Sequence, residues 1–364
     1  MRLVQTATVL EGTLLGKAIY NDKGQILLNE GVKLERKLIK RLIEMGIHYI
    51  YIKDQKTEDL AICDPLSMKL KKKAMDSIEK HFLEIESGKD MSNVLALEKA
   101  AKNLKTLVRE ILFEIKSNQE LLVLLSEVYT YDHYIFTHSL NVTMYSLAIG
   151  IKLNLPEKDL EVLGLGAILH DVGKMKIPEQ ILLKPDKLTK EEYEEVKKHA
   201  EVGFQILRKI PNVSLIVAHC AYQHHERLNG TGYPRGIKSK DIHYFGKIIA
   251  VADVFDAVTS NRVYRQAMLP HEGLEILYSG SETLFDKKII EAFRQAVAVY
   301  PVGITVVLND GRKGVVSKQN SGVSDRPVVR IIEENGMEVS PYEINLQAEL
   351  DLMITACDTT FPKN

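Results

Sequence analysis

Histidine and aspartate residues are concentrated in one part of this 364-residue chain. Eight of the eleven histidines lie between His133 and His243. The stretch "ILHDVGK" places His170 and Asp171 at the end of an apolar run, with Lys174 shortly after. An imidazole nitrogen can bind one metal ion, a carboxylate can bridge two, and a lysine can neutralise a phosphoryl oxygen. The same stretch could also be an ordinary helix C-terminus, where a histidine and a lysine interact favourably with the helix dipole. Potential metal ligands elsewhere in the chain are needed to distinguish the two interpretations.

Such partners occur on other segments. The residues that complete a candidate set of metal ligands are His138, His199, His224, His225 and Asp253. Adjacent helical residues point roughly 100° apart, so His224 and His225 suit two ions better than one. Asp253 lies in the apolar stretch "IIAVADVFDAVTS", where a carboxylate must bind a metal or pair with a neighbour such as an arginine. Imidazole and carboxylate ligands without thiolate suit iron, manganese or zinc, and two close ions would create a hydroxide nucleophile.

Helices are needed to bring these residues together. Apolar spacing predicts helices over residues 138–152, 159–170 and 245–260. "LTKEEYEEVKKH" opens with a capping box, Thr189 followed by Glu192, and ends at one of the candidate ligands. We therefore expect the ligands to lie on separate helices of one bundle.

The two ends of the chain show β patterns. "GKAIYNDKGQILL" has two apolar runs around a turn at residues 21–24, and "IHYIYI" indicates a strand after a helical pattern at residues 34–46. Near the C-terminus, "ITVVLNDGRKGVVS" and "PVVRIIEENGMEVS" each contain an Asn-Asp-Gly or Asn-Gly turn, typical of β-hairpins. We expect a small N-terminal α/β unit over residues 1–64, which would be regulatory, and a β-rich C-terminal extension over residues 301–364.

The middle of the chain is helical. Residues 65–127 predict a linker of two amphipathic helices broken near residues 87–89, and residues 128–300 hold the candidate ligands. The lysines of "MKLKKK" are expected to form a solvated face, with nucleic acid or anionic lipid as the alternative. The linker helices would pack on the next unit or on a second copy, which makes a homodimer an option.

Composition narrows the function classes. Hydrophobic residues make up 45% of the chain, charged residues 27%, and the formal net charge is −1, so there is no global basic signal for a nucleic acid polymer. Three scattered cysteines suit a reducing compartment. No stretch reaches the roughly 18 apolar residues of a membrane span, and the N-terminus lacks a signal peptide pattern. We expect a cytoplasmic protein without a membrane span.

The motifs occur in a recognisable order. "HDVGK", then His199, then "HHERLNGTGYP", then "IIAVADVFDAVTSNRVYR" resemble the HD-GYP family of cyclic di-GMP phosphodiesterases, a branch of the HD phosphohydrolase superfamily. The resemblance covers residues 128–300. It implies a mainly α fold, in which an HD-type helical bundle is the catalytic domain between the small α/β unit and the C-terminal β-hairpin segment. It also implies a bacterial second-messenger hydrolase with a centre of two or three metals, iron or manganese above all.

The resemblance also implies roles for single residues. Its metal ligands correspond to His138, His170, Asp171, His199, His224, His225 and Asp253. Asp171 would bridge the ions, and Lys174 would contact the scissile phosphate. Tyr233 and Pro234 would flank the substrate, and Arg262 and Arg265 would hold its second phosphate or a guanine. Members with three metals carry a glutamate where this chain has Tyr134, so we expect a binuclear centre.

The implied reaction is hydrolysis of cyclic di-GMP to the linear dinucleotide pGpG, with GMP as the product of a further cut. A metal-bound hydroxide would attack phosphorus, while the cations and Lys174 neutralise the developing charge. Three alternatives stay open. The protein would otherwise be a cyclic di-GMP receptor with little turnover, an HD phosphohydrolase acting on another nucleotide, or a redox or oxygen sensor with a di-iron centre.

Overall fold

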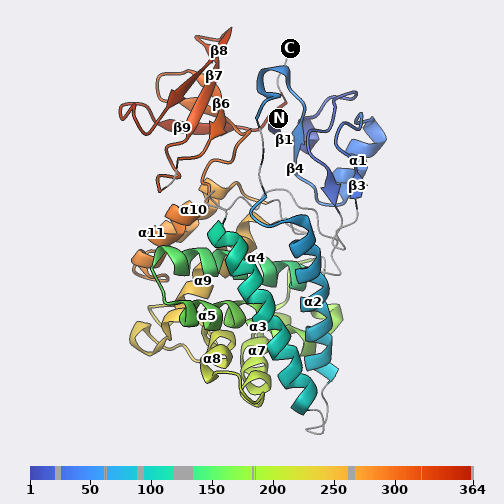
Figure 1. The fold of residues 1–364 in the computed structure, drawn as a ribbon, viewed down its shortest axis with the longest axis vertical. Coiled ribbons are helices and arrows are strands. Elements are labelled where there is room, and N and C mark those ends of the chain that lie inside the picture. Colours follow the sequence, from blue (N-terminus) through green and yellow to red (C-terminus); the bar gives the residue numbers. More distant parts are fainter. Residues whose placement is uncertain are drawn as a thin grey trace.

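The molecule has a helical part and two β-containing units, which lie above the helices in Figure 1. The computed structural model describes residues 1–20, 26–60, 62, 64–87, 94–117, 134–182, 184, 186–260, 267–320 and 322–361. The fold is mainly helical, with short strands near the N-terminus and a five-stranded antiparallel sheet near the C-terminus, as the sequence predicts.

The helices pack around one large hydrophobic cluster. Their bounds are α2 (Met68–Ser87), α3 (Val94–Ser117), α4 (Tyr134–Lys152), α5 (Glu157–Leu169), α6 (Glu179–Leu182), α7 (Lys190–Leu207), α8 (Leu215–Gln223), α9 (Tyr244–Thr259), α10 (Pro270–Ser279) and α11 (Lys287–Ala296). The central helix α4 contacts α2, α5, α9 and α11, and almost all its described side chains are buried. A helix that is apolar on every side belongs inside a bundle, so α4 and α9 can carry polar residues into a dry interior.

The helix predictions differ from the structure mainly at the ends. The segments predicted at residues 138–152, 159–170 and 245–260 correspond to α4, α5 and α9, each shifted by a few residues. The capping box at the start of α7 is confirmed: the Thr189 hydroxyl accepts from the Glu192 amide, and the Glu192 carboxylate accepts from the Thr189 amide. The predicted break near residues 87–89 falls at the end of α2, and residues 88–89 lie outside the described residues.

The N-terminal unit combines a helix with two antiparallel strand pairs. Strand β1 (Arg2–Gln5) pairs with β4 (Tyr49–Ile52), and β2 (Ile19–Tyr20) pairs with β3 (Ile26–Leu28). Helix α1 (Arg36–Glu44) packs its apolar face on these strands. The predicted hairpin is thus present, although its turn at residues 21–24 lies outside the described residues.

The C-terminal unit is one antiparallel sheet with the order β8-β7-β6-β5-β9. Its strands are β5 (Thr305–Leu308), β6 (Lys313–Lys318), β7 (Val328–Glu334), β8 (Met337–Asn345) and β9 (Ile354–Asp358). Both predicted hairpins are confirmed, as β5–β6 and β7–β8. Strand β9 was not predicted, because it pairs with the distant β5 and carries no hairpin turn of its own.

The two β units share a hydrophobic core. Leu3 of β1 lies in the same cluster as Ile304 and Val306 near the start of the C-terminal sheet. An ion pair joins the two units as well, since the Arg330 guanidinium contacts the Asp59 carboxylate at 2.5 and 2.7 Å. The division of the chain at residues 64, 127 and 300 stays a prediction, but the outer two parts have one common core.

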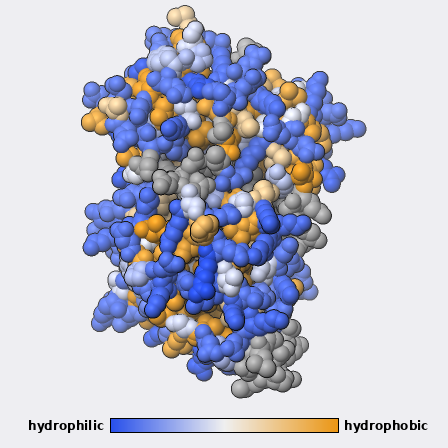
Figure 2. All heavy atoms as spheres, viewed as in Figure 1, coloured by the Kyte–Doolittle hydropathy of each residue, from blue (hydrophilic) through white to orange (hydrophobic). Residues whose placement is uncertain are grey.

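The surface adds two observations. None of the described helices is both long and apolar enough to cross a membrane. Hydrophilic residues cover most of the face shown in Figure 2, where apolar residues are scattered over the helical part and the β units. This face therefore adds no support for the predicted homodimer.

Candidate metal centre

The candidate ligands come from five helical segments that meet in the bundle. His138 lies in α4, His170 follows the end of α5, and His199 lies in the middle of α7, which continues to Leu207 and does not end at His199 as the sequence suggested. His224 and His225 follow α8, and Asp253 lies in α9. The seven sequence-predicted ligands, including Asp171 in the turn after α5, line one buried cluster.

A close crossing of two segments makes this meeting possible. The turn after α5 continues as a short 3-10 helix, η5 (Val172–Lys176), which packs against α7. At Gly173 an added Cβ atom would lie 2.0 Å from the His199 carbonyl oxygen and 2.6 Å from the Gly203 amide nitrogen. Only glycine allows the two backbones to come so close. The crossing brings Asp171 next to His199.

Asp171 is at the centre of the cluster. Its Oδ2 atom lies 3.4 Å from Nε2 of both His138 and His170. Its Oδ1 atom lies 3.3 Å from Nε2 of His199 and 3.7 Å from Nε2 of His224. The two oxygens of one buried carboxylate therefore face two different pairs of imidazoles.

Asp253 faces the cluster from α9. Its Oδ1 atom lies 3.1 Å from Nε2 of His138, and its Oδ2 atom lies 3.6 Å from Nδ1 of His225. Potential ligand atoms fall into two compact groups that share Asp171. One contains Asp171, His199, His224 and His225, and the other contains His138, His170 and Asp171. His224 and His225 thus fall in one group, contrary to the expectation that they suit two ions, because they lie in the turn after α8 and not within a helix. This donor set is suited to two cations held by one shared carboxylate.

The hydrogen bonds of the imidazoles show that the cluster fits a cation. Nδ1 of His170, His199 and His224 donates to the backbone carbonyls of Ala167, Val196 and Ala221 at 2.6 to 2.9 Å. Because a carbonyl only accepts, the proton of each neutral ring lies on Nδ1 and the lone pair on Nε2. These lone pairs point at a carboxylate and at each other, with Nε2 of His199 and His224 3.3 Å apart.

Two potential ligand atoms of the cluster also lack a hydrogen-bond partner. Nε2 of His170 and Oδ1 of Asp171 are buried and make no hydrogen bond. A buried acceptor without a donor is costly, and converging acceptors repel one another. Bound metal ions would remove both costs, so the residues present fit a metal centre.

The charge states agree with this interpretation. Burial lowers the pKa of His199 to about 4 and holds the pKa values of His224 and His225 well below the usual range. Burial alone would raise the pKa of Asp171, but the Lys174 ammonium and the nearby imidazoles keep it well below normal. Neutral imidazoles around an ionised carboxylate are the forms that bind metal.

His138 differs from the other histidines. Burial lowers its pKa, but the Asp253 and Asp256 carboxylates outweigh burial and raise it to about 9. Its Nδ1 atom lies 2.7 Å from Oδ2 of Asp256, and the other oxygen of that carboxylate, Oδ1, accepts hydrogen bonds from the Asn141 amide and the Ser260 hydroxyl at 2.9 Å. A cation facing Nε2 would replace the proton on that atom.

Asp256 and Asn141 are therefore neighbours of the centre. In the sequence, Asp256 lies one helical turn after Asp253, a spacing that suggests support of the metals or of Arg262, and the structure shows its bond to His138. Asn141 was missed, although it lies three residues after His138 on the same helix, where side chains share a face. Metal-bound histidines usually need an acceptor on the other nitrogen, and Asp132 is a further candidate for that role from the sequence, but it lies outside the described residues.

The loop that contains Tyr233 is fixed beside the cluster. The Tyr233 ring stacks on the His225 ring, with centroids 4.5 Å apart. Glu226 is buried and accepts hydrogen bonds from the backbone amides of Arg235 and Ile237 at 2.8 and 3.1 Å. Its place directly after His225 in the sequence suggests that Glu226 orients a histidine or lies at a solvated helix end, but it instead anchors the part of the loop that follows Pro234.

Some predicted positions cannot be placed. Arg262 and Arg265 lie outside the described residues, and so does the side chain of Tyr134. Lys174 lies at the edge of the cluster, where its ammonium contacts Oδ2 of Asp171 at 2.5 Å.

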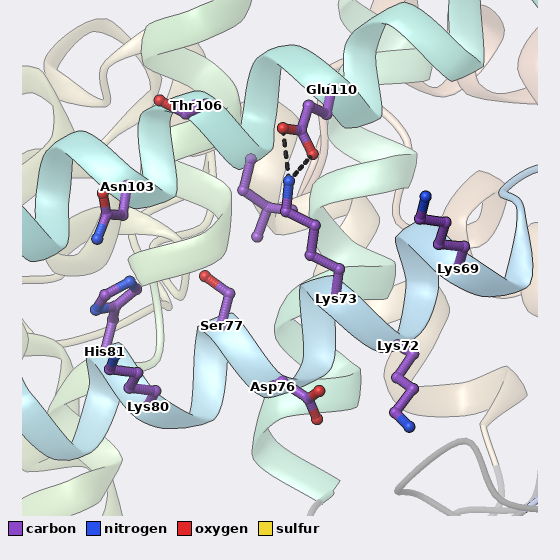
Figure 3. Close-up of a pocket in the computed structure, with 11 residues that line it drawn as sticks. Lys69, Lys72, Lys73, Asp76, Ser77, Lys80, His81, Asn103, Thr106 and Glu110 are labelled. Atoms are coloured by element: carbon purple, nitrogen blue, oxygen red, sulfur yellow. Dashed lines mark hydrogen bonds and ion pairs between the residues drawn. The ribbon is translucent and has the colours of Figure 1, made fainter.

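A separate hollow of about 620 Å³ lies between α2 and α3. Its lysines do not converge: Lys73 pairs with Glu110, while Lys69 and Lys72 point away from each other (Figure 3). Lys71 is only 8% exposed, so the expectation of one solvated lysine face is wrong for that residue. The lysines therefore do not surround one position for an anion, whereas the histidines of the metal cluster do surround positions for a cation.

Comparisons with known proteins agree with this site. Residues 112–289 match the family model described as HD domain. The chain is 36% identical over 225 residues to "Cyclic di-GMP phosphodiesterase PA4108" of Pseudomonas aeruginosa, covering 62% of this chain and 54% of the relative. It is 38% identical over 198 residues to "Cyclic di-GMP phosphodiesterase" of Thermotoga maritima, covering 54% of this chain and 52% of the relative.

The chain thus spans about half the length of these curated relatives. A solved structure titled "Bd1817, a HDG"Y"P protein from Bdellovibrio bacteriovorus" aligns with a TM-score of 0.47 at 20% identity, over 80% of this chain and 97% of that one. Residues 112–289 thus resemble an HD domain, and the chain is similar in sequence to cyclic di-GMP phosphodiesterases.

Proposed function

We propose that the protein is a metal-dependent phosphodiesterase that hydrolyses cyclic di-GMP to pGpG, with GMP as the product of a second cut. The observation that carries the proposal is the shared carboxylate of Asp171, whose two oxygens face separate imidazole pairs. The names of the related phosphodiesterases support the choice of substrate.

The proposed ligands form two sets around Asp171. His199, His224 and His225 would hold one cation, and His138, His170 and Asp253 would hold the other. Iron or manganese suits this nitrogen and oxygen set. When bound, the cations would supply an activated water and positive charge for the phosphoryl oxygens.

The other proposed roles belong to side chains near the cluster. Lys174 contacts Asp171 and would exchange part of this contact for a phosphoryl oxygen, where its ammonium stabilises developing charge. Tyr233 and Pro234 would flank the substrate. Arg262 and Arg265 would bind its second phosphate or a guanine. A binuclear centre, a homodimer and a cytoplasmic location stay predictions from the sequence.

Product chromatography tests the proposal directly. Protein purified without oxygen and loaded with iron or manganese should convert cyclic di-GMP to pGpG, and a chelator should stop the reaction. Binding without turnover would indicate the receptor instead. Turnover of another nucleotide alone would indicate a different HD phosphohydrolase, and spectral changes with oxygen but no product would indicate a sensor.

A further inference from the structure

Two tyrosine rings and one ammonium lie together beside the metal cluster. Tyr193 and Lys197 are one helical turn apart on α7, so they share a face. The Tyr193 and Tyr233 centroids are 6.5 Å apart at an interplanar angle of 79°. Nζ of Lys197 lies 4.9 Å from the Tyr193 centroid and 5.6 Å from the Tyr233 centroid.

This group continues outward from the proposed ligands. Tyr233 stacks on His225 and is edge-on to His199, with centroids 6.3 Å apart. Tyr193 lies edge-on to Tyr233 and is 47% exposed. A substrate whose phosphate reaches the cluster would therefore have flat groups within reach of the Tyr193 ring.

The large exposed fraction of Tyr193 needs a reason. The first turn of α7 is already fixed by its capping box and by the ion pair of Lys184 with Glu192 at 2.7 Å. An aromatic ring left half in solvent adds little to the core, but it offers a π surface on which a nucleobase can stack.

We propose that Tyr193 and Lys197 form a purine-base subsite that selects guanine over adenine. The proposal rests on the proposed function, because it assigns the base of the same substrate. The Tyr193 ring stacks on the base, and the Lys197 ammonium donates to its edge. Guanine presents two acceptors there, O6 and N7, whereas adenine presents N7 and an amino donor. A cation therefore favours guanine.

Lys197 can make this contact without leaving its present place. It forms one ion pair, with Glu194 at 2.6 Å, and an ammonium has three donors. The neighbouring Lys198 forms the same kind of pair with Glu195 at 2.5 Å but is 61% exposed, and it points away from the tyrosines because adjacent helical residues differ by roughly 100°. Lys198 is thus a matched control.

The first test uses the absence of tryptophan from the sequence. Tyr193→Trp introduces the sole tryptophan and keeps an aromatic ring. Rapid mixing with cyclic di-GMP should quench its fluorescence before turnover, as expected for a stacked guanine. Tyr278→Trp, at a tyrosine that is 37% exposed on α10, should show no quenching.

Kinetics provide a second readout. Tyr193→Ala should raise KM for cyclic di-GMP by about 10-fold, since stacking of one base is worth roughly that much, and kcat should change far less.

An unchanged KM together with unquenched fluorescence of Tyr193→Trp would overturn the stacking role, even if the wild-type protein hydrolyses cyclic di-GMP. If the wild type hydrolyses no cyclic di-GMP, the proposed function fails. Quenching by GMP would then still support a base site, and no quenching would reject it.

The selectivity of Lys197 has its own test. The ratio of kcat/KM for cyclic di-GMP to that for cyclic di-AMP should fall by about 10-fold in Lys197→Met, the discrimination expected from one edge contact. Lys198→Met should keep the wild-type ratio. A ratio that is equal in all three proteins would reject the selection of guanine by Lys197.

Discussion

At the scale of single residues, the cluster depends on which nitrogen of each imidazole carries a proton. Three rings are fixed by backbone carbonyls, but His138 depends on a side chain, Asp256. A carboxylate bound to the far nitrogen of a metal-binding histidine fixes its tautomer and increases its basicity. Asp256 is therefore a positioning residue for His138.

We expect Asp256→Asn to lower metal affinity or activity by roughly 10- to 100-fold, the usual effect of such a partner. The neutral amide oxygen accepts from Nδ1 more weakly than a charged carboxylate does. Chelator competition would measure the affinity, and thermal unfolding would show whether the fold survives. Asp186→Asn, at an exposed position, is the control. A metal affinity equal to that of the wild type would contradict the role of Asp256.

Polar residues in apolar segments could be recognised from the sequence. The seven proposed ligands could be chosen because burial of an imidazole or a carboxylate costs free energy unless the group is paired or binds a metal. Asn141 was missed although it shares a helical face with His138, and the loop-anchoring role of Glu226 could not be predicted. Both act through hydrogen bonds between segments that are distant in sequence or between a side chain and backbone, which residue type alone does not reveal.

At the scale of elements, the glycine in "HDVGK" decides how closely η5 crosses α7. We expect Gly173→Ala to destabilise the fold by roughly 1 to 3 kcal/mol, the usual cost of overpacking, because its Cβ would overlap backbone atoms of α7. Separation of Asp171 from His199 should also reduce metal content. Denaturant unfolding and elemental analysis would measure the two effects.

Gly246→Ala is a milder change of the same kind. Its nearest contact would be 3.2 Å, from Cβ of the Gln223 side chain, so a much smaller loss is expected there. If Gly173→Ala were as stable and as rich in metal as the wild type, the close crossing would not determine the site.

Elements were predicted well where the pattern is local. Apolar spacing, a capping box and Asn-Gly turns indicate helices and hairpins within a few residues. The joining of the two hairpins into one sheet depends on pairing between β6 and β7, and strand β9 depends on its pairing with the distant β5. No local pattern encodes these pairings.

At the scale of the whole molecule, the first and last parts of the chain stabilise each other. Leu3 is fully buried in the cluster that contains Ile304 and Val306. We expect Leu3→Ala to cost about 2 to 5 kcal/mol, as for other buried leucines, and to lower hydrogen-exchange protection in both β units. Leu10→Ala, at a leucine that is 57% exposed, should change stability by only about 0.5 kcal/mol. Loss of protection in the N-terminal unit alone would contradict a shared core.

The central proposal is that Asp171 would help to hold two cations, which would supply an activated water for hydrolysis of a cyclic dinucleotide. The most direct measurement combines elemental analysis of anaerobically purified protein with chromatography of the products from cyclic di-GMP, for the wild type and Asp171→Asn. We predict about two metal ions per wild-type chain and release of pGpG, with both metal and product lost in Asp171→Asn. Equal metal content and equal hydrolysis in the two proteins would contradict the claim.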